Sequence, residues 1–350
     1  MPPEMRAACV RGRGAIEIAR LPIPEPGAGE VRVAVEACGV CGSDLHLFHS
    51  GYFAPGTTPG HESAGRIDVL GPGVAGLATG TRVAIEPMRS CGTCAACRRG
   101  AYSICRQSQL HGVNLPGGLA EYIVVPADRV HRVPADLDPQ LAALAEPMAV
   151  VVHALARGSA AAGQRVLVLG AGSVGLLTVV AARRLGAAEV WISARHPHQI
   201  ELARTLGATR VLNEAEAEPA VLDALGRETD IDLVVETVGG QADTLRAASA
   251  AVRPGGTISV VGVFLGGAAI DPLGLLMKEV TMAWSYCYGL RVPRAGRSSS
   301  DFAEAIDVID AERDALAALI THRFPLDQIA QAFDVAGDRR DGAIKVSITP

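Results

Sequence analysis

Residues 165–187, RVLVLGAGSVGLLTVVAARRLGA, leave few folds open to this chain. An apolar run is followed at once by the glycine pattern GAGSVG and then by a helical pattern. Gly170 permits a tight turn, Gly172 lets backbone N–H groups approach a pyrophosphate, and Gly175 allows the helix to pack closely. Such glycine spacing arises by chance in glycine-rich chains, but its position between a strand and a helix predicts a dinucleotide-binding domain.

The segments on either side of this one divide the chain into two kinds of structure. Downstream, the short apolar runs EVWISAR, RVLNE, IDLVVETVG and GTISVVGVF alternate with helical stretches, as a doubly wound parallel sheet requires. Upstream, VRVAVEA, AGRIDVLGPGV, GTRVAIEP and LAEYIVVP alternate between Gly and Pro turns, which predicts an antiparallel, barrel-like domain. The last segment has a helical pattern from about Ser299 and then the strand GAIKVSI, and the RVPRAGRSSS stretch before it is the most loop-like.

Length and composition agree with two folded domains and exclude several classes of protein. A chain of 350 residues is too long for one typical core. Its 49% hydrophobic and 20% charged residues are typical of a folded, soluble protein. Because the net charge is -5, no general field attracts nucleic acid or an anionic membrane, and we expect neither as a partner.

Two segments bear on the cellular compartment. The N-terminus, MPPEMRAACV, lacks the basic head and apolar core of a secretory signal. The uncharged run from Val166 to Ala182 is shorter than the roughly 20 residues that span a bilayer, and glycines interrupt it. We therefore expect a cytoplasmic protein whose eight cysteines are mostly reduced, which favours metal binding over disulfides.

Four of the cysteines form the array C-x2-C-x2-C-x7-C within RSCGTCAACRRGAYSIC. Thiolates spaced this closely on a loop supply the four tetrahedral ligands that Zn²⁺ prefers, and they leave no open position. We therefore predict a structural zinc held by Cys91, Cys94, Cys97 and Cys105. Free or disulfide-bonded cysteines are the alternative that a reducing compartment disfavours. A nucleic-acid-binding zinc ribbon is disfavoured because three arginines but no aromatic stacking platform accompany the array.

The end of the second parallel strand indicates which dinucleotide binds. An NAD-selective site places Asp or Glu about 20 residues past the glycines, where it binds the ribose 2′-OH. Ala194 stands at that place, flanked by Ser193 and Arg195, and Glu189 lies at the wrong end of the strand. Because Ser193 and Arg195 can donate to a 2′-phosphate, we predict NADP(H) in preference to NAD(H). The alternative is that Arg195 is only a solvated surface residue.

The stretch CGVCGSDLHLFHSGYFAPGTTPGHESAG, residues 38–65, offers a second metal site. A catalytic zinc takes mixed N, O and S ligands and keeps one exchangeable position. Cys41 and the adjacent pair His61 and Glu62 offer those atoms, and Glu146 offers another carboxylate at the predicted start of a helix. Their spacing in the sequence does not show that these residues meet in space. For His61 taken alone, the alternative is a buried histidine with a structural role. Cys38, like Cys9 and Cys287, is interpreted as a small apolar residue.

Together these motifs resemble one family. CGVCGSDLH, PGHESAGRI, the four-cysteine array, LAEYIVVP, EPMAVVVHAL and VLVLGAGSVGLLTVVAARRLGA occur in the order and at the spacings of the zinc-dependent medium-chain alcohol dehydrogenases. The branch that contains polyol and threonine dehydrogenases is the most similar. The resemblance covers nearly the whole chain.

The resemblance implies a fold, a reaction and a set of site residues. The implied fold is α/β, with a GroES-like β-barrel catalytic domain (1–150 and 296–350) and a Rossmann cofactor domain (151–295). The implied reaction is hydride transfer between a nicotinamide cofactor and a secondary alcohol, a polyol or the corresponding ketone, in a homodimer or homotetramer with two Zn²⁺ per chain. The implied ligands of the catalytic zinc are Cys41, His61, Glu62 and Glu146, and the implied proton relay is Ser43 and His46. The implied cofactor contacts are Gly170, Gly172, Ser173, Val174, Gly175, Ser193, Arg195, Val238, Val261 and Lys345.

The chain also departs from the family pattern. Thr81 replaces the usual acid of a turn, and Ala194 replaces the acid of NAD-dependent members. MAWSYCYG, residues 282–289, falls where the family has a dimer-edge strand, and its aromatic residues either line a substrate pocket or pack in a core or interface. Two other functions remain as alternatives to the predicted one. The first is a non-catalytic, zinc-stabilised NADPH-binding structural or sensor protein, and the second is an NAD-dependent polyol or amino-alcohol dehydrogenase. A zinc-independent enone reductase is disfavoured because it needs neither metal site.

Overall fold

The computed structural model describes residues 2–264, 266–290 and 300–350. The chain forms two compact units, the first made of residues 1–146 and 289–350 and the second of residues 147–288. The predicted boundary after residue 150 lies four residues from the observed one. The boundary predicted between residues 295 and 296, and all of the predicted loop except Ser300, lie outside the described residues.

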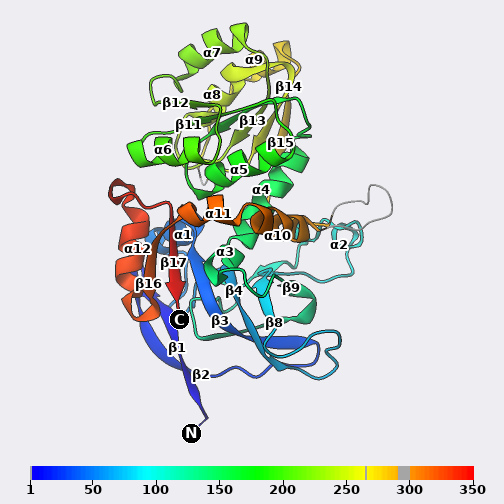
Figure 1. The fold of residues 1–350 in the computed structure, drawn as a ribbon, viewed down its shortest axis with the longest axis vertical. Coiled ribbons are helices and arrows are strands. Elements are labelled where there is room, and N and C mark those ends of the chain that lie inside the picture. The colour runs from blue at the N-terminus through cyan, green and yellow to red at the C-terminus, as the bar shows by residue number, and fades with distance from the viewer. Residues whose placement is uncertain (1, 265, 291–299) are drawn as a thin grey trace. The chain divides into compact units, whose positions relative to one another are not determined.

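The first unit is built on a seven-stranded sheet in the order β16-β17-β3-β4-β5-β9, with β8 also paired to β3 (Figure 1). In β3 (Glu30–Val40), Val31, Val33 and Val35 are buried at every second position, as expected of a strand with one face on a core. All pairs are antiparallel except β16 with β17. The other strands are β4 (Glu62–Leu70), β5 (Arg82–Ile85), β8 (Tyr122–Pro126), β9 (Val130–Arg132), β16 (Ile320–Pro325) and β17 (Lys345–Thr349).

Shorter elements complete this unit. Two two-stranded antiparallel sheets are also present: the hairpin of β1 (Glu4–Gly12) and β2 (Ala15–Pro22), and the pair β6 (Met88–Arg89) and β7 (Gln109–Leu110), whose long connection holds the four-cysteine array. The helices are α1 (Gly42–Ser50), α2 (Ala95–Arg98), α3 (Pro139–Ala143), α10 (Asp301–Ala311), α11 (Arg313–Leu316) and α12 (Ile329–Gly337). The 3-10 turns are η1 (Tyr102–Ile104), η2 (Ala127–Arg129), η3 (Ala317–Leu319), η4 (Leu326–Gln328) and η5 (Arg339–Asp341). Segments from both ends of the chain therefore build one core, in which Phe333 of α12 packs against Phe48 of α1.

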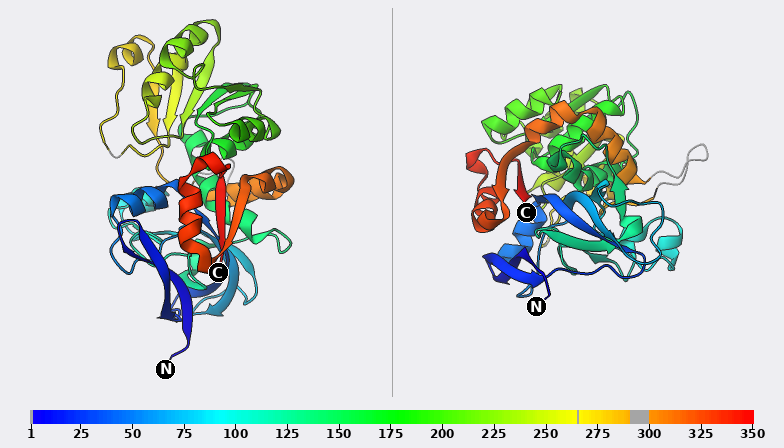
Figure 2. Two further views of the ribbon diagram at one scale, coloured as in Figure 1. Left: turned by 90° about the vertical axis from the view of Figure 1, so that its left-hand side faces the viewer. Right: turned by 60° about the horizontal axis from the view of Figure 1, so that its bottom comes forward.

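The second unit is a six-stranded parallel sheet with helices on both faces (Figures 1 and 2). Its strand order, β12-β11-β10-β13-β14-β15, is the 3-2-1-4-5-6 order of a doubly wound dinucleotide-binding fold. The strands are β10 (Arg165–Leu169), β11 (Glu189–Ser193), β12 (Arg210–Leu212), β13 (Ile231–Glu236), β14 (Val252–Val260) and β15 (Thr281–Trp284). The helices are α5 (Ser173–Arg184), α6 (Pro197–Thr205), α7 (Pro219–Glu228), α8 (Thr244–Ala251) and α9 (Pro272–Met277), and α4 (Ala145–Arg157) crosses the boundary between the units. Among the described residues, no helix has both the length and the apolar character needed to cross a bilayer.

Candidate active site and metal centres

The four-cysteine array folds into a compact cluster of sulfurs. Cys94 caps α2, Cys97 lies within it, and Cys105 follows η1. The Sγ atoms of Cys91 and Cys97 are 3.8 Å apart, and those of Cys94 and Cys97 and of Cys105 and Cys91 are 3.5 Å apart. Ligands at about 2.3 Å from a tetrahedral zinc lie about 3.8 Å from one another, so these sulfurs fit Zn²⁺. The predicted set of four therefore converges on one point.

Backbone donors favour thiolates in this cluster. Backbone N–H groups of Thr93 and Cys94 lower the pKa of the Cys91 thiol to about 6. The backbone N–H of Cys94 donates to the Cys91 sulfur at 3.4 Å, and that of Gln107 donates to the Cys105 sulfur at 3.3 Å. Desolvation raises the pKa of the Cys97 thiol to about 11, so the four sulfurs become thiolates together only when a cation offsets their charge.

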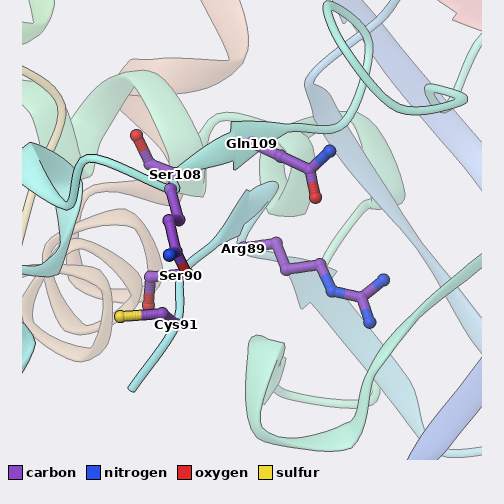
Figure 3. Close-up of a pocket in the computed structure, with 6 residues that line it drawn as sticks. Arg89, Ser90, Cys91, Ser108 and Gln109 are labelled. Carbon is purple, nitrogen blue, oxygen red and sulfur yellow. The ribbon is translucent and has the colours of Figure 1, made fainter. Parts of the chain in front are cut away.

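A pocket of about 440 Å³ opens on the surface of this lobe. Figure 3 shows Arg89 and Gln109, which are opposite one another on β6 and β7, projecting to the same side, whereas the sulfur of Cys91 points away from them. The lining is polar and consists of Arg89, Ser90, Cys91, Gln107, Ser108 and Gln109. It shares no residue with the mixed-ligand cluster described next.

Three residues that spacing could not pair meet at one end of the first unit. Cys41 follows β3, His61 precedes β4 and Glu62 is the first residue of β4. In the β3–β4 ladder Gly39 lies opposite Glu62, which brings the two segments together. One ligand atom from each of Cys41, His61 and Glu62 lies within 4.8 Å of the others, and His61 and Glu62 are buried. These sulfur, nitrogen and oxygen donors are the mixed set that a catalytic zinc takes.

Asp44, which the sequence analysis did not single out, orients this cluster. Its side chain is 0% exposed, and Oδ2 accepts a hydrogen bond of 3.0 Å from the backbone N–H of Cys41. Its Oδ1 lies 3.3 Å from Nδ1 of His61. A carboxylate at one imidazole nitrogen fixes the ring and leaves the other nitrogen, Nε2, for a metal. The available signal was an acid three residues after Cys41, the capping-box position of α1.

The electrostatics of His61 show how anionic its surroundings are. Burial lowers the pKa of His61, but the charges of Asp44 and Cys41 outweigh it and raise that pKa well above the ordinary value. A metal cation would relieve the same anionic field. Nε2 of His61 also lies 3.4 Å from Oγ of Ser43, on the first turn of α1.

Lys345 joins the cluster from the opposite end of the chain. It begins β17, is 1% exposed, and its Nζ donates to both carboxylate oxygens of Glu62 at 2.8 and 2.7 Å and to the backbone oxygen of Val40 at 3.3 Å. Burial lowers the pKa of Lys345, but Glu62, Cys41 and Glu146 outweigh it and raise that pKa. Lys345 was predicted to contact the cofactor, and that contact stays a prediction; in the structure its ammonium contacts Glu62 and Val40.

Two other predicted site residues of the first unit, Glu146 and His46, lie outside the group formed by Cys41, His61 and Glu62. Glu146 is 6% exposed in the first turn of α4, and it lies outside the 4.8 Å group although its charge acts on Lys345. His46 is exposed on α1, one turn after Ser43. The geometry therefore joins Ser43 to the cluster more directly than it joins His46.

The glycine turn of the second unit has the geometry of a phosphate site. Gly170 has a φ of 101°, which side chains rarely tolerate, and Gly172 caps α5, whose first residues are Ser173, Val174 and Gly175. A side-chain carbon at Gly175 would come within 1.8 Å of the Gly170 oxygen, so only glycine permits this helix to approach the turn. Free N–H groups at such a helix start bind pyrophosphate.

The residues predicted to select the dinucleotide gather at the end of β11. Ser193 accepts a hydrogen bond of 2.9 Å at Oγ from the backbone N–H of Gly170, so its hydroxyl proton is still available for donation. Arg195 is 68% exposed and pairs with the exposed Glu214 at 2.5 Å. Ala194 is buried, Val238 is 43% exposed and Val261 is half-buried. The position at which an NAD-selective protein has an acid is therefore occupied by alanine in this chain.

Comparison with known proteins agrees with both units. The family described as alcohol dehydrogenase GroES-like domain matches residues 27–135, and that described as zinc-binding dehydrogenase matches residues 173–311. L-threonine 3-dehydrogenase of Anaeromyxobacter sp. (strain Fw109-5) is 32% identical over 341 residues, which cover 95% of this chain and 96% of that protein. The chain belongs to the zinc-dependent medium-chain alcohol dehydrogenases.

Two further proteins are similar to this dehydrogenase over its whole length. Sorbitol dehydrogenase of Bacillus subtilis (strain 168) is 31% identical over 368 residues, covering 100% of this chain and 98% of that protein. The crystal structure of a zinc-binding dehydrogenase from Sinorhizobium meliloti 1021 bound to NADP has a TM-score of 0.88 and 31% identity, covering 99% of this chain and 100% of that one.

Family membership decides several of the sequence predictions. The predicted fold, a GroES-like domain and a Rossmann domain, is confirmed. The predicted reaction class is confirmed as well: this dehydrogenase is a zinc-dependent oxidoreductase of alcohols.

Proposed function

We propose that this dehydrogenase transfers a hydride between NADP(H) and a secondary alcohol, a polyol or the corresponding ketone, with two Zn²⁺ per chain. The observation that carries the proposal is the convergence of Cys41, His61 and Glu62 within 4.8 Å. The second zinc is proposed for the sulfurs of the four-cysteine lobe, whose separations of 3.5–3.8 Å fit one tetrahedral ion.

The residues of the mixed cluster fit a catalytic zinc and have separate tasks in this proposal. When bound there, Zn²⁺ supplies a Lewis acid that polarises the substrate oxygen. Cys41 and His61 hold the ion, and Glu62 and Glu146 supply the carboxylates that complete its shell. Asp44 keeps His61 in the tautomer whose Nε2 faces the ion, and Lys345 balances the charge of Glu62.

Ser43 is proposed to carry the substrate proton. Its Oγ lies 3.4 Å from Nε2 of His61, so it stands beside the place where the substrate oxygen is held. A hydroxyl accepts one proton while it donates another, which suits a relay. His46, exposed one turn later on α1, is proposed to pass the proton to solvent, because an exposed imidazole can both accept and donate a proton.

NADP(H) is proposed as the preferred cofactor. The support is the exposed guanidinium of Arg195 and the hydroxyl of Ser193 at the end of β11, where Ala194 replaces an acid. A carboxylate at that place would repel a 2′-phosphate, whereas a guanidinium attracts it. The choice rests on these residues, because solved structures of similar proteins hold NADP in one case and NADH in another.

A panel of alcohols and ketones assayed with both cofactors tests the function. We expect turnover of secondary alcohols or polyols, and two zinc ions per chain by elemental analysis. Cys41→Ser and His61→Ala are each expected to abolish turnover while NADPH binding persists. Retained turnover in either variant would contradict the assigned ligands. No turnover of any substrate by zinc-loaded protein that binds NADPH would favour the rival function, a non-catalytic sensor.

A homodimer or homotetramer is proposed for the assembled enzyme. The support is the edge strand β15 of the parallel sheet, with exposed apolar side chains on it and on α9, at Leu273, Leu276, Met277 and Trp284. Exposed apolar side chains next to a strand that ends the sheet, as β15 does among the described residues, favour association with a second copy. Light scattering of wild type and Leu276→Arg tests this, with a monomeric wild type as the contradicting result.

The cytoplasm is proposed as the compartment, because the zinc-binding thiols need reducing conditions. The cysteines of the two proposed zinc sites, Cys41, Cys91, Cys94, Cys97 and Cys105, form no disulfide in the structure. Fractionation of cells that produce the protein tests this proposal, and recovery from an extracellular or periplasmic fraction would contradict it.

A further inference from the structure

Glu236 is a buried carboxylate at the carboxyl edge of the parallel sheet, outside the residues predicted to bind cofactor. It is the last residue of β13 and is 0% exposed. Its Oε1 accepts hydrogen bonds from the backbone N–H groups of Val238 at 2.8 Å and Gly239 at 2.9 Å, and from the hydroxyl of Thr244 at 2.8 Å. Three donors on one oxygen hold this carboxylate in a single orientation.

The second oxygen of Glu236 shows how closely two loops meet at this point. Oε2 is buried and has no hydrogen-bond partner among the described residues. A side-chain carbon at Gly262 would come within 2.3 Å of it, and the backbone N–H groups of Val261 and Gly262 donate to the backbone oxygen of Glu236 at 2.9 and 3.1 Å. A buried carboxylate oxygen without a partner costs free energy, so its retention calls for a functional reason.

The position of Glu236 in the sheet indicates that reason. The strand order reverses between β10 and β13, and dinucleotides bind outside the carboxyl ends of the strands at such a reversal. The loop after β10 is the glycine turn. The connection from β13 to α8 is residues 237–243, and its first part, loop 237–240, is anchored by Glu236. These two loops therefore lie on either side of the position at which a doubly wound sheet binds a dinucleotide.

Loop 237–240 packs directly against the glycine turn. Oγ1 of Thr237 donates to the backbone oxygen of Leu169 at 2.8 Å. A side-chain carbon at Gly170 would come within 2.5 Å of Cγ2 of Val238. Gly239 and Gly240 have φ values of 64° and 67°, in the left-handed region. Glycine reaches this region easily but also populates others, so the two glycines do not by themselves hold the loop in one conformation. Hydrogen bonds from other residues must do so, and Glu236 accepts two of them from the loop backbone.

We propose that Glu236 is a positioning residue for the nicotinamide dinucleotide. Its carboxylate draws the N–H groups of Val238 and Gly239 inward and so fixes the exposed Val238 side chain against the glycine turn, where the cofactor binds. This inference rests on the proposed dinucleotide function and adds to it a residue that acts through loop 237–240. Loss of the carboxylate frees the loop, and the cofactor must then order it on binding, which weakens affinity.

The test compares Glu236→Ala with Glu236→Gln in the full-length, zinc-loaded protein. Glutamine keeps a carbonyl oxygen for the three donors, whereas alanine removes the acceptor. We expect the Kd for NADPH, measured by fluorescence titration, to rise about tenfold in Glu236→Ala and by less than about twofold in Glu236→Gln. The kinetic readout is the split between KM and turnover: because bound NADPH orders loop 237–240, the KM for NADPH should rise by a larger factor than the turnover number at saturating cofactor falls.

Ser249→Ala is the matched control, because Ser249 is a buried residue of α8 whose hydroxyl bonds only within its own helix, to Leu245 at 2.8 Å. We expect it to lower Tm without changing the Kd for NADPH. Thr244→Val removes one of the three donors to Glu236 and is expected to raise the Kd for NADPH about threefold. This variant replaces Glu236→Ala in the test if the alanine variant does not fold.

The outcomes separate this inference from the proposed function. Wild-type protein that binds neither NADPH nor NADH would contradict the proposed function itself. Wild-type binding with an unchanged Kd in Glu236→Ala, or in Thr244→Val where the alanine variant does not fold, would show a structural role only and overturn the inference.

Discussion

Lys345 and Glu62 form a buried ion pair across 283 residues of sequence, with Nζ at 2.8 and 2.7 Å from the two carboxylate oxygens. Both side chains are almost completely buried. A buried carboxylate is tolerated only when a cation and hydrogen bonds offset its lost hydration. The pair therefore determines how much of the charge of Glu62 is available to a metal.

Replacing Lys345 by methionine should destabilise the first unit strongly. The variant leaves Glu62 buried without its cation, which costs about 3 kcal/mol or more in the free energy of unfolding. The double variant Glu62→Gln, Lys345→Met should recover part of that loss, because no charge is then left unpaired. Chemical denaturation of the two single variants and the double variant measures the coupling. Additive effects of the two substitutions would contradict the pairing.

Lys278 offers the matched control for that experiment. It is the only other lysine in the sequence, and its Nζ donates to the backbone oxygens of Ser249, Ala250 and Val252 at 2.9–3.1 Å. It has no carboxylate partner among these contacts. Lys278→Met should therefore show no coupling to Glu62→Gln.

Asp44→Asn should weaken zinc binding at the mixed cluster. The asparagine keeps an acceptor for the Cys41 N–H but loses the charge that orients His61. Loss of a carboxylate that holds a histidine ligand weakens metal affinity by roughly 10–100-fold. Chelator competition measures this, and Asp68→Asn, in a half-buried pair with Arg32, is the control. Unchanged zinc affinity in Asp44→Asn would refute the orienting role.

Cys94→Ser should affect stability more than chemistry. Removal of one sulfur from the four-cysteine lobe should reduce the zinc content from two to one per chain and lower Tm by more than about 5 °C. Cys9→Ala, which changes a buried cysteine outside both clusters, should keep two zinc ions. A zinc-depleted Cys94→Ser protein with wild-type Tm would be incompatible with a structural site.

Arg195→Ala should change cofactor preference. Loss of the guanidinium should raise the KM for NADPH by about tenfold or more and leave the KM for NADH nearly unchanged, because only NADPH carries the 2′-phosphate. Arg204→Ala, at the other end of α6, is the control. Equal KM values for the two cofactors in both wild type and variant would remove the selectivity assigned to Arg195.

Glu36 should contribute to the loss of stability in acid. Burial raises its pKa, but the guanidinium groups of Arg82 and Arg66, at 2.8 and 2.9 Å, outweigh this and hold the pKa below its ordinary value of 4.5. Because the folded-state pKa is lowered, the stabilisation is complete above pH 4.5 and is lost as the pH falls through the folded-state pKa.

Tm profiles from pH 3 to 7 check this contribution. Glu36→Gln should have a lower Tm than wild type near neutrality and a shallower decline below about pH 5. Glu17→Gln, in an exposed pair with Arg11, should follow the wild-type profile. If Tm falls with decreasing pH equally in wild type and Glu36→Gln, the carboxylate of Glu36 does not cause the loss of stability in acid.

The sequence predicts most where the chemistry is local. The four cysteines span 15 residues, so their spacing alone predicts a shared metal. The strand, turn and helix around Gly170 are likewise contiguous, and the structure has β10, the turn and α5 there. Local hydrogen bonds and short loops restrict such segments enough for a pattern to be decisive.

The sequence predicts least where the site depends on strand register. Cys41 and His61 meet because Gly39 pairs with Glu62 in the β3–β4 ladder, and a one-residue slip would separate them. Lys345 reaches Glu62 because β17 pairs with β3, a contact that no local pattern encodes. Ser193 illustrates the same limit, since its oxygen accepts from Gly170, a contact made between two neighbouring strands.

The distribution of lysines gives the protein a built-in chemical probe. Each compact unit contains one lysine, Lys345 in the first and Lys278 in the second, and each amine is engaged in hydrogen bonds to its own unit. Lys345 is 1% exposed, so an amine-directed reagent should acylate it only after the first unit opens. Lys278 is half-buried, so its acylation requires only that its ammonium leave the three backbone oxygens that it binds. Mass spectrometry of the labelled peptides would then separate the opening of the first unit from a local motion in the second.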